Sequence, residues 1–177
     1  MQVRTTNPVT DDLLGDVVQI CLVTKSHVRT MDSLLRLGIG PFRVHKHHPG
    51  TISNTRFRGN AHTFTAVMAY AYSANIMWEI VEPVEGTGVF DEFLAQKGEG
   101  VHHFGFQCKG RSYSEALAEF ERRGFNVVQS GRVWGGQIGF AFIGTYDELG
   151  VFFEIWDHPP GFGPPDPDSW YPAKPIN

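Results

Sequence analysis

Two stretches, MWEIVE at residues 77–82 and FFEIWD at residues 152–157, share one pattern and decide the fold. In each of them a glutamate, Glu79 or Glu154, stands in the middle of an apolar run that is typical of a β-strand. A carboxylate is rarely buried in such a run unless it has a partner. The recurrence of this arrangement 75 residues further along the chain (79 to 154) therefore predicts a duplicated structural unit.

The segments that precede each glutamate have the same order in both halves of the chain. A short apolar strand comes first and a capped amphipathic helix follows, with Ser26 as the cap in one half and a Ser112–Glu115 capping box in the other. Three strand-like segments then complete each unit, at residues 41–48, 62–72 and 75–82, and at residues 125–130, 138–146 and 150–157. The sequence therefore predicts an α+β fold with two tandem βαβββ modules, forming a curved mixed sheet around a cavity.

The predicted boundaries follow from these patterns. Residues 1–14 form an N-terminal segment, and residues 15–158 form a single domain with modules 15–85 and 99–158, joined by a helical connector. Residues 159–177 are a Pro-rich tail, which excludes a helix or an inner strand. We expect this tail to pack irregularly on the surface, with Phe162, Trp170 and Tyr171 as anchors.

Composition excludes several classes of function. The chain has 177 residues, 41% of them hydrophobic, which is enough for a core, and a net charge of −4 without a basic block. We therefore expect no nucleic-acid partner. No apolar run approaches the roughly 20 residues that span a bilayer, so no membrane role is expected. The polar start has no signal-peptide pattern, and Cys21 and Cys108 form no CxxC motif, which favours a cytoplasmic location.

The two glutamates point to a metal site. Because side chains two residues apart share a face of a strand, both carboxylates can enter one cavity if the two modules curve toward each other. Alignment of the first strands of the modules, VQICLV and HHFGFQ, places Gln19 opposite His103. The set Gln19, Glu79, His103 and Glu154 offers three oxygens and one nitrogen. Such a set suits Zn, Mn, Co, Ni or Fe(II) better than Ca.

The phrases DVVQICLV, LGIGPFRV, MWEIVEPVEG, GEGVHHFGF and GVFFEIWD together resemble the vicinal oxygen chelate superfamily, which includes glyoxalase I, methylmalonyl-CoA epimerase and extradiol dioxygenases. The resemblance covers residues 15–158 and is closest to the epimerase-like and glyoxalase-like branch. It implies that the first and last strands of each module supply the ligands, which are Gln19, Glu79, His103 and Glu154 here. Because Gln19 replaces one histidine of the 2-His-1-carboxylate pattern, oxygen activation is disfavoured. The superfamily also makes a homodimer the expected assembly.

The resemblance implies a metal-dependent isomerase, epimerase or lyase that acts on a small oxygenated molecule through a metal-stabilised enolate. The aromatic residues near the ligands favour a hydrophobic substrate. Glu154 is one candidate for the base. His62 is the other, since the strand that holds a carboxylate in the epimerases has no acid here. Two alternatives stay open: a glyoxalase I-type lactoylglutathione lyase, and a metal-free small-molecule binding protein of the resistance type.

Several nearby residues have simpler interpretations. The two glutamates can be core carboxylates in ion pairs without a metal. Strand alternation predicts that His102 points away from His103 and is structural. Cys21 is interpreted as core packing, and His45 and His47 as part of a solvated hairpin rather than a metal site.

Overall fold

A computed structural model describes residues 13–86 and 88–175 of the chain. The predicted N-terminal segment, 1–14, lies outside the described residues except for its last two positions. Among the helices in the described ranges, none has the length and apolar character that are needed to cross a bilayer.

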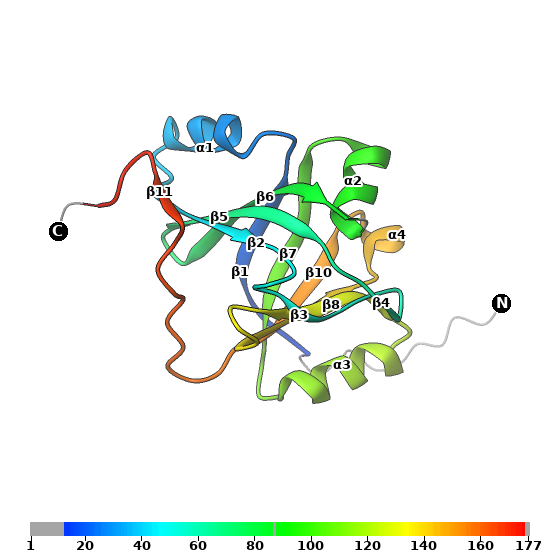
Figure 1. Cartoon of the computed structure of the whole chain (residues 1–177). Helices are drawn as coiled ribbons and strands as arrows, with labels where there is room; N and C mark the ends of the chain where they lie inside the picture. Colours follow the sequence, from blue (N-terminus) through cyan, green and yellow to red (C-terminus); the bar gives the residue numbers. More distant parts are fainter. Residues whose placement is uncertain (1–12, 87, 176–177) are drawn as a thin grey trace.

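The first half of the chain forms the predicted βαβββ unit with one added hairpin (Figure 1). The side chain of Ser26 caps the helix and accepts a hydrogen bond from the backbone N–H of Arg29, as predicted. The elements of this half are β1 (Leu14–Val23), α1 (His27–Leu35), β2 (Phe42–His47), β3 (Ser53–Phe57), β4 (Asn60–Ala61), β5 (Thr65–Ser73) and β6 (Ile76–Glu85).

The β3–β4 hairpin was not predicted. Its turn consists of Arg58 and Gly59, whose φ angles of 47° and 80° are both positive, as in the tight turns that join two paired strands. Only Thr55 of β3 is buried, so the strand has no alternating apolar pattern by which it could be recognised.

The second half repeats the unit. Ser112 and Glu115 form the predicted capping box at the start of its helix. The predicted connector helix is present, and a third, short helix precedes the last strand of the unit. The elements are α2 (Val89–Lys97), β7 (Gly100–Cys108), α3 (Tyr113–Arg122), β8 (Val127–Val133), β9 (Ile138–Ile143), α4 (Tyr146–Leu149), β10 (Phe152–Asp157) and, after the unit, β11 (Ser169–Tyr171).

The strands form one curved mixed sheet in the order β11-β2-β5-β6-β1-β7-β10-β9-β8-β3-β4 (Figure 1). Antiparallel pairing of β1 with β7 joins the two units within the chain. In this order β2 is the second strand from one end of the sheet, and β3, which pairs with β8, is the second strand from the other end. Because a short connection joins these two strands, the sheet has to curve around its inner face.

Strand alternation separates the two faces of the sheet. Ile80 packs in the cluster that contains Met31 and Leu34 of α1. Ile155 packs in the cluster that contains Ala116 and Phe120 of α3. The residues just before these isoleucines, Glu79 and Glu154, consequently point to the other, inner face. This inner face carries a third apolar cluster and lines a cavity.

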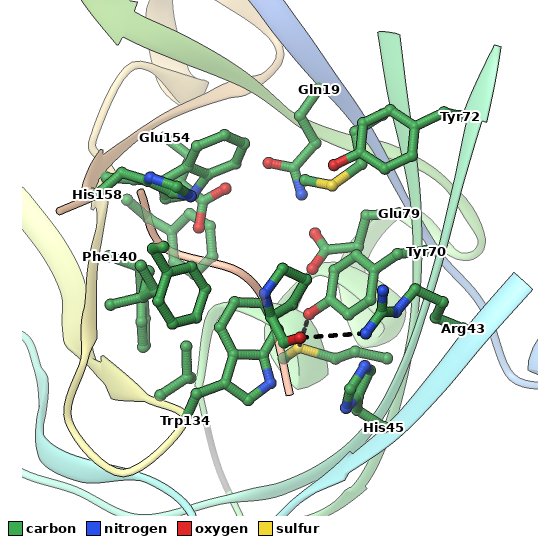
Figure 2. A pocket seen from close by; sticks show the side chains of 18 of the residues that line it. Gln19, Arg43, His45, Tyr70, Tyr72, Glu79, Trp134, Phe140, Glu154 and His158 are labelled. Carbon is green, nitrogen blue, oxygen red and sulfur yellow. Dashed lines mark hydrogen bonds between the residues drawn. The ribbon is translucent and has the colours of Figure 1, made fainter. Parts of the chain in front are cut away.

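The Pro-rich tail folds back along the first half. Its strand β11 adds to the edge strand β2, so the expectation of irregular packing is wrong for these residues, whereas the exclusion of an inner strand is confirmed. The predicted anchors are confirmed: Phe162 stacks on Trp134 with ring centroids 5.5 Å apart, and Trp170 and Tyr171 are half-buried. The segment between β10 and β11 contributes the side chains of His158, Phe162 and Pro164 to the wall of the cavity (Figure 2).

Candidate metal centre

Two neighbouring rows of paired residues cross the inner face of the sheet. In the first row Gln19 of β1 pairs with Gly105 of β7, which pairs with Glu154 of β10. In the second row Glu79 of β6 pairs with Cys21 of β1, which pairs with His103 of β7. The side chains predicted as ligands therefore come from four adjacent strands, and they meet because the rows are adjacent.

The imidazole of His103 and the carboxylates of Glu79 and Glu154 lie close together in the interior. Nε2 of His103 lies 3.2 Å from Oε2 of Glu79 and 3.1 Å from Oε2 of Glu154. Gln19 and His103 are 1% and 0% exposed, and the two glutamates are 6% and 5% exposed. Burial of two carboxylates in one place is costly unless a positive charge compensates them.

The arrangement of unpaired atoms fits a metal ion. Among the described residues, Oε1 of Gln19 has no hydrogen-bond partner, and Nε2 of His103 and Oε2 of Glu154 lie 3.1 Å apart as an ion pair without a well-aligned hydrogen bond. Buried polar atoms without a partner are rare and call for an explanation. Amide, imidazole and carboxylate atoms are ligands of borderline and hard divalent ions, and a cation at their meeting point would satisfy all three.

Without a metal, His103 supplies the compensating charge. Burial lowers its pKa, but the nearby carboxylates of Glu154 and Glu79 outweigh this effect and raise the pKa to about 9. Burial also raises the pKa of Glu154, opposed by the charge of His103. The imidazole is therefore protonated at neutral pH in the metal-free protein, and a metal has to displace this proton in order to bind Nε2.

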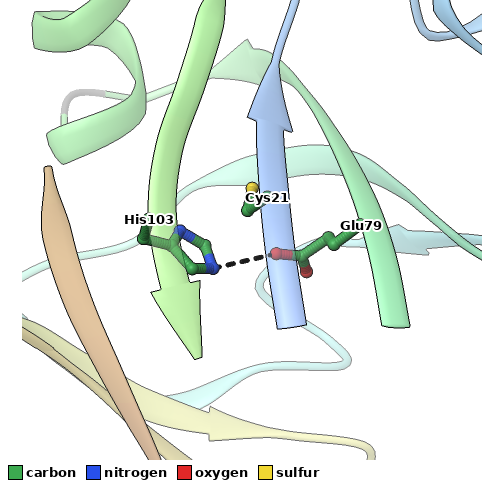
Figure 3. Close-up of side chains that lie close together, drawn as sticks. All are labelled: Cys21, Glu79 and His103. Carbon is green, nitrogen blue, oxygen red and sulfur yellow. Dashed lines mark ion pairs between the residues drawn. The ribbon is translucent and has the colours of Figure 1, made fainter. Parts of the chain in front are cut away.

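Cys21 is a further candidate ligand that the sequence interpretation assigned to core packing. The thiol is fully buried, and its Sγ lies within 4.8 Å of ligand atoms of Glu79 and His103 (Figure 3). Burial, together with the charge of Glu79, raises the pKa of this thiol well above its usual range. A bound cation would have the opposite effect, because coordination deprotonates a thiol.

Gly105 makes room for the centre, a role that no sequence pattern indicates. A Cβ at this position would lie 2.6 Å from Oε1 of Gln19 and 2.9 Å from Cζ2 of Trp156. Gly105 pairs with both Gln19 and Glu154, and its absent side chain leaves the space into which the amide of Gln19 extends.

The position of His102 corrects the prediction that it points away from His103. Cys21 pairs with His103, whereas the next residue, Leu22, pairs with Val101, so β7 has one extra residue here. This β-bulge breaks the strand alternation. As a result Nδ1 of His102 lies 2.9 Å from Nδ1 of His103, which leaves Nε2 of His103 directed at the glutamates. Such contacts hold a ligand ring in its orientation.

His62, predicted as a candidate base, is not brought to the four ligands. It follows β4 and stacks near the rings of Phe57 and Phe64, and a Cβ on Gly88 would contact its Nε2. The side chain is absent from the cavity wall. The role of His62 as the base therefore stays a prediction, and Glu154 is the candidate that lies in the cavity wall.

His45 and His47 do not belong to a solvated hairpin. They are 5% and 1% exposed, because Trp134 of the β8–β9 hairpin covers both rings, with ring centroids 5.8 and 5.9 Å away. Burial, reinforced by His45, lowers the pKa of His47 to about 4, so this ring is neutral at physiological pH.

The centre lies in the wall of a cavity of roughly 190 Å³ (Figure 2). Gln19, Glu79 and Glu154 contribute polar groups to this wall, and Arg43 and His45 contribute others. The rest of the wall is largely apolar and includes the side chains of Phe64, Met68, Phe90, Phe140, Phe142 and Trp156. The arrangement can hold a cation and, beside it, a mostly apolar molecule with a few oxygen atoms.

Comparison with known proteins agrees with this architecture. Among solved structures, a hypothetical protein from Bacillus halodurans C-125 is similar with a TM-score of 0.63 and 16% identity, over 84% of this chain and 97% of that one. Methylmalonyl-CoA epimerase from Mycobacterium tuberculosis is similar with a TM-score of 0.59 and 14% identity, over 84% and 91% of the two chains.

A variant of 4-hydroxymandelate synthase from Streptomyces coelicolor is similar with a TM-score of 0.52 and 17% identity, over 83% of this chain and 50% of that one. No curated protein matches the sequence significantly. At these identities the solved structures establish the fold alone. The sequence model of the glyoxalase/bleomycin resistance protein/dioxygenase superfamily matches residues 18–142, and the chain belongs to this superfamily.

Proposed function

We propose that this protein is a divalent-metal-dependent isomerase, epimerase or lyase that acts on a small, largely hydrophobic oxygenated substrate. The observation that carries the proposal is the position of Gln19, Glu79 and Glu154 in the wall of a largely apolar cavity, with Nε2 of His103 within 3.2 Å of both carboxylates. The donor set suits Zn, Mn, Co, Ni or Fe(II). When bound, such an ion stabilises negative charge that develops on a carbonyl oxygen as the adjacent carbon loses a proton.

The protein's own side chains would perform the proton transfer. Glu154 is the candidate base: its carboxylate would leave the ion to accept the proton, and burial, which raises the pKa of this carboxyl group, then favours the protonated form. Burial, with the charges of Glu79 and Glu154, raises the pKa of Tyr70 well above its usual range, so its hydroxyl stays protonated. The apolar walls exclude water and hold the substrate. Return of the proton gives isomerisation or epimerisation, and departure of a β-substituent gives a lyase.

Exchange of the substrate's α-proton in D₂O tests the proposed chemistry directly. The metal-loaded protein is incubated with 2-hydroxy and 2-oxo acids that have aryl or alkyl groups, with methylmalonyl-CoA, and with methylglyoxal plus glutathione. We expect NMR to show catalysed exchange for at least one compound, and a decrease of about 100-fold or more in Glu154→Gln. Glu148→Gln, an exposed position on α4, is the control. Equal exchange in Glu154→Gln and wild type would remove Glu154 as the base.

One observation favours a metal-free binding protein as the second candidate function. The protonated His103 ring between two carboxylates already forms a compensated cluster, at 3.2 and 3.1 Å. This candidate predicts that ligands bind equally well before and after treatment with a chelator. Assembly as a homodimer in the cytoplasm is part of both candidates, and size-exclusion chromatography with light scattering tests the dimer.

A further inference from the structure

Arg43 lies in the same row of the sheet as Glu79 and His103. It pairs with Tyr70 of β5, and Tyr70 pairs with Glu79 of β6. Neighbouring strands are about 4.8 Å apart, so the backbones of Arg43 and Glu79 are separated by roughly 10 Å. Figure 2 shows Arg43 and His45 at one end of the pocket, with Gln19 and Glu154 at the other end. The cavity thus has a second polar region apart from the candidate ligands.

This second region has hydrogen-bonding groups without partners. Nε of Arg43, Nε2 of His45 and Nε1 of Trp134 are buried and make no hydrogen bond within the part of the chain that the structure describes. A guanidinium and an indole can only donate. A group that satisfies them is therefore a hydrogen-bond acceptor. All three side chains contribute to the wall of the cavity.

The charge of Arg43 makes an anion the favoured acceptor. Its terminal nitrogen donates to the backbone oxygens of Pro164 and Pro165, at 3.2 and 2.6 Å. In the described ranges no carboxylate forms an ion pair with Arg43; Asp168, on the same segment, accepts from the backbone N–H of Lys46. A carboxylate is a stronger partner for a guanidinium than a carbonyl oxygen is.

We propose that the substrate carries a carboxylate at the end remote from the metal, and that Arg43, His45 and Trp134 bind this group. The substrate class is then a compact oxygenated carboxylic acid: chelating oxygens at one end, an apolar middle against the phenylalanine-rich wall, and an anionic group beneath residues 162–165. On binding, the carboxylate replaces the Pro164 and Pro165 oxygens as the acceptor for Arg43. The part played by the metal rests on the proposed function, whereas the carboxylate subsite can be tested independently.

Two probes that differ only at the remote group test this subsite. One is 3-(3,4-dihydroxyphenyl)propanoate, whose adjacent hydroxyls chelate a metal, and the other is its primary amide. Calorimetric titration of the zinc-loaded full-length protein is expected to show about tenfold or more tighter binding of the acid. Arg43→Met is expected to reduce this preference to about twofold or less, without changing zinc content or the affinity for the amide. Arg36→Met, an exposed position just after α1, is the matched control.

Trp134→Phe provides a second variant, because it removes the indole N–H and keeps an aromatic ring over His45 and His47. We expect it to weaken the preference for the acid by a smaller factor than Arg43→Met does. Equal affinities of the wild type for acid and amide, or an undiminished preference in Arg43→Met, would overturn the proposed subsite. If the protein takes up none of Zn, Mn, Co and Ni, the proposed function fails, and the acid–amide comparison on the metal-free protein still decides the subsite. If the protein binds neither probe, the proposed subsite is also overturned.

Discussion

At the scale of single residues, the candidate metal centre depends on the lack of a side chain at Gly105 as well as on the ligands. Gly105 lies between Gln19 and Glu154 in one row of the sheet. Strand alternation, with alignment of the two modules, is sufficient to predict which four polar side chains face the centre, and their role as ligands stays a proposal. It does not identify Gly105, since the need for a glycine arises from close approach of neighbouring strands.

Gly105→Ala tests this role. The added Cβ would lie 2.6 Å from Oε1 and 2.8 Å from Cβ of Gln19, so the glutamine has to move. We expect urea denaturation to show a loss of about 1–3 kcal/mol in the free energy of unfolding, with weaker metal binding. Gly163→Ala, where a Cβ meets nothing within 4 Å, serves as the control. Unchanged metal affinity in Gly105→Ala would contradict the role assigned to this glycine.

The protonation of His103 gives a prediction about pH. Its pKa of about 9 in the metal-free protein lies above that of a free histidine, so at pH 7 the ring carries a proton that a metal must displace. Metal affinity should therefore rise with pH up to about 9, by about tenfold per unit for each proton released. Calorimetry in buffers with different ionisation enthalpies should show release of about one proton per metal at pH 7. Binding without proton release would show that Nε2 of His103 is not a ligand.

At the scale of elements, the sequence predicts those that have a regular apolar period or a cap. The helices capped by Ser26 and Ser112 and the eight strands of the two predicted modules are where the pattern places them. The β3–β4 hairpin and β11 lack such a period, because they are held by pairing to distant strands. The β-bulge at His102 breaks alternation locally, and nothing in the one-dimensional pattern indicates it.

The tail provides a prediction at this scale. The carboxylate of Asp168 accepts a hydrogen bond of 2.6 Å from the backbone N–H of Lys46 on β2. In Asp168→Ala this amide loses its partner, and hydrogen exchange at Lys46 should become about tenfold faster. Exposed Asp166 is the matched control position. Similar exchange at Lys46 in Asp168→Ala and Asp166→Ala would show that this contact does not hold the tail on β2.

At the scale of the whole molecule, duplication explains why the site forms where it does. Each unit alone contributes one strand pair to the centre, β1 with β6 or β7 with β10, and the β1–β7 pairing brings the pairs together. The sequence predicts this architecture through its repeat. The sequence does not predict that the tail contributes to the cavity wall, because the position of the tail depends on tertiary contacts such as that between Phe162 and Trp134.

The central claim is that Gln19, Glu79, His103 and Glu154 bind one divalent metal, and elemental mass spectrometry of the purified protein tests it most directly. We predict about one equivalent of a transition metal in the wild type and in the control Glu148→Ala, and nearly none in Glu154→Ala, since loss of one ligand from such a set greatly weakens binding. A wild-type protein that stays empty after incubation with Zn, Mn, Co and Ni would contradict the claim, as would full metal content in Glu154→Ala.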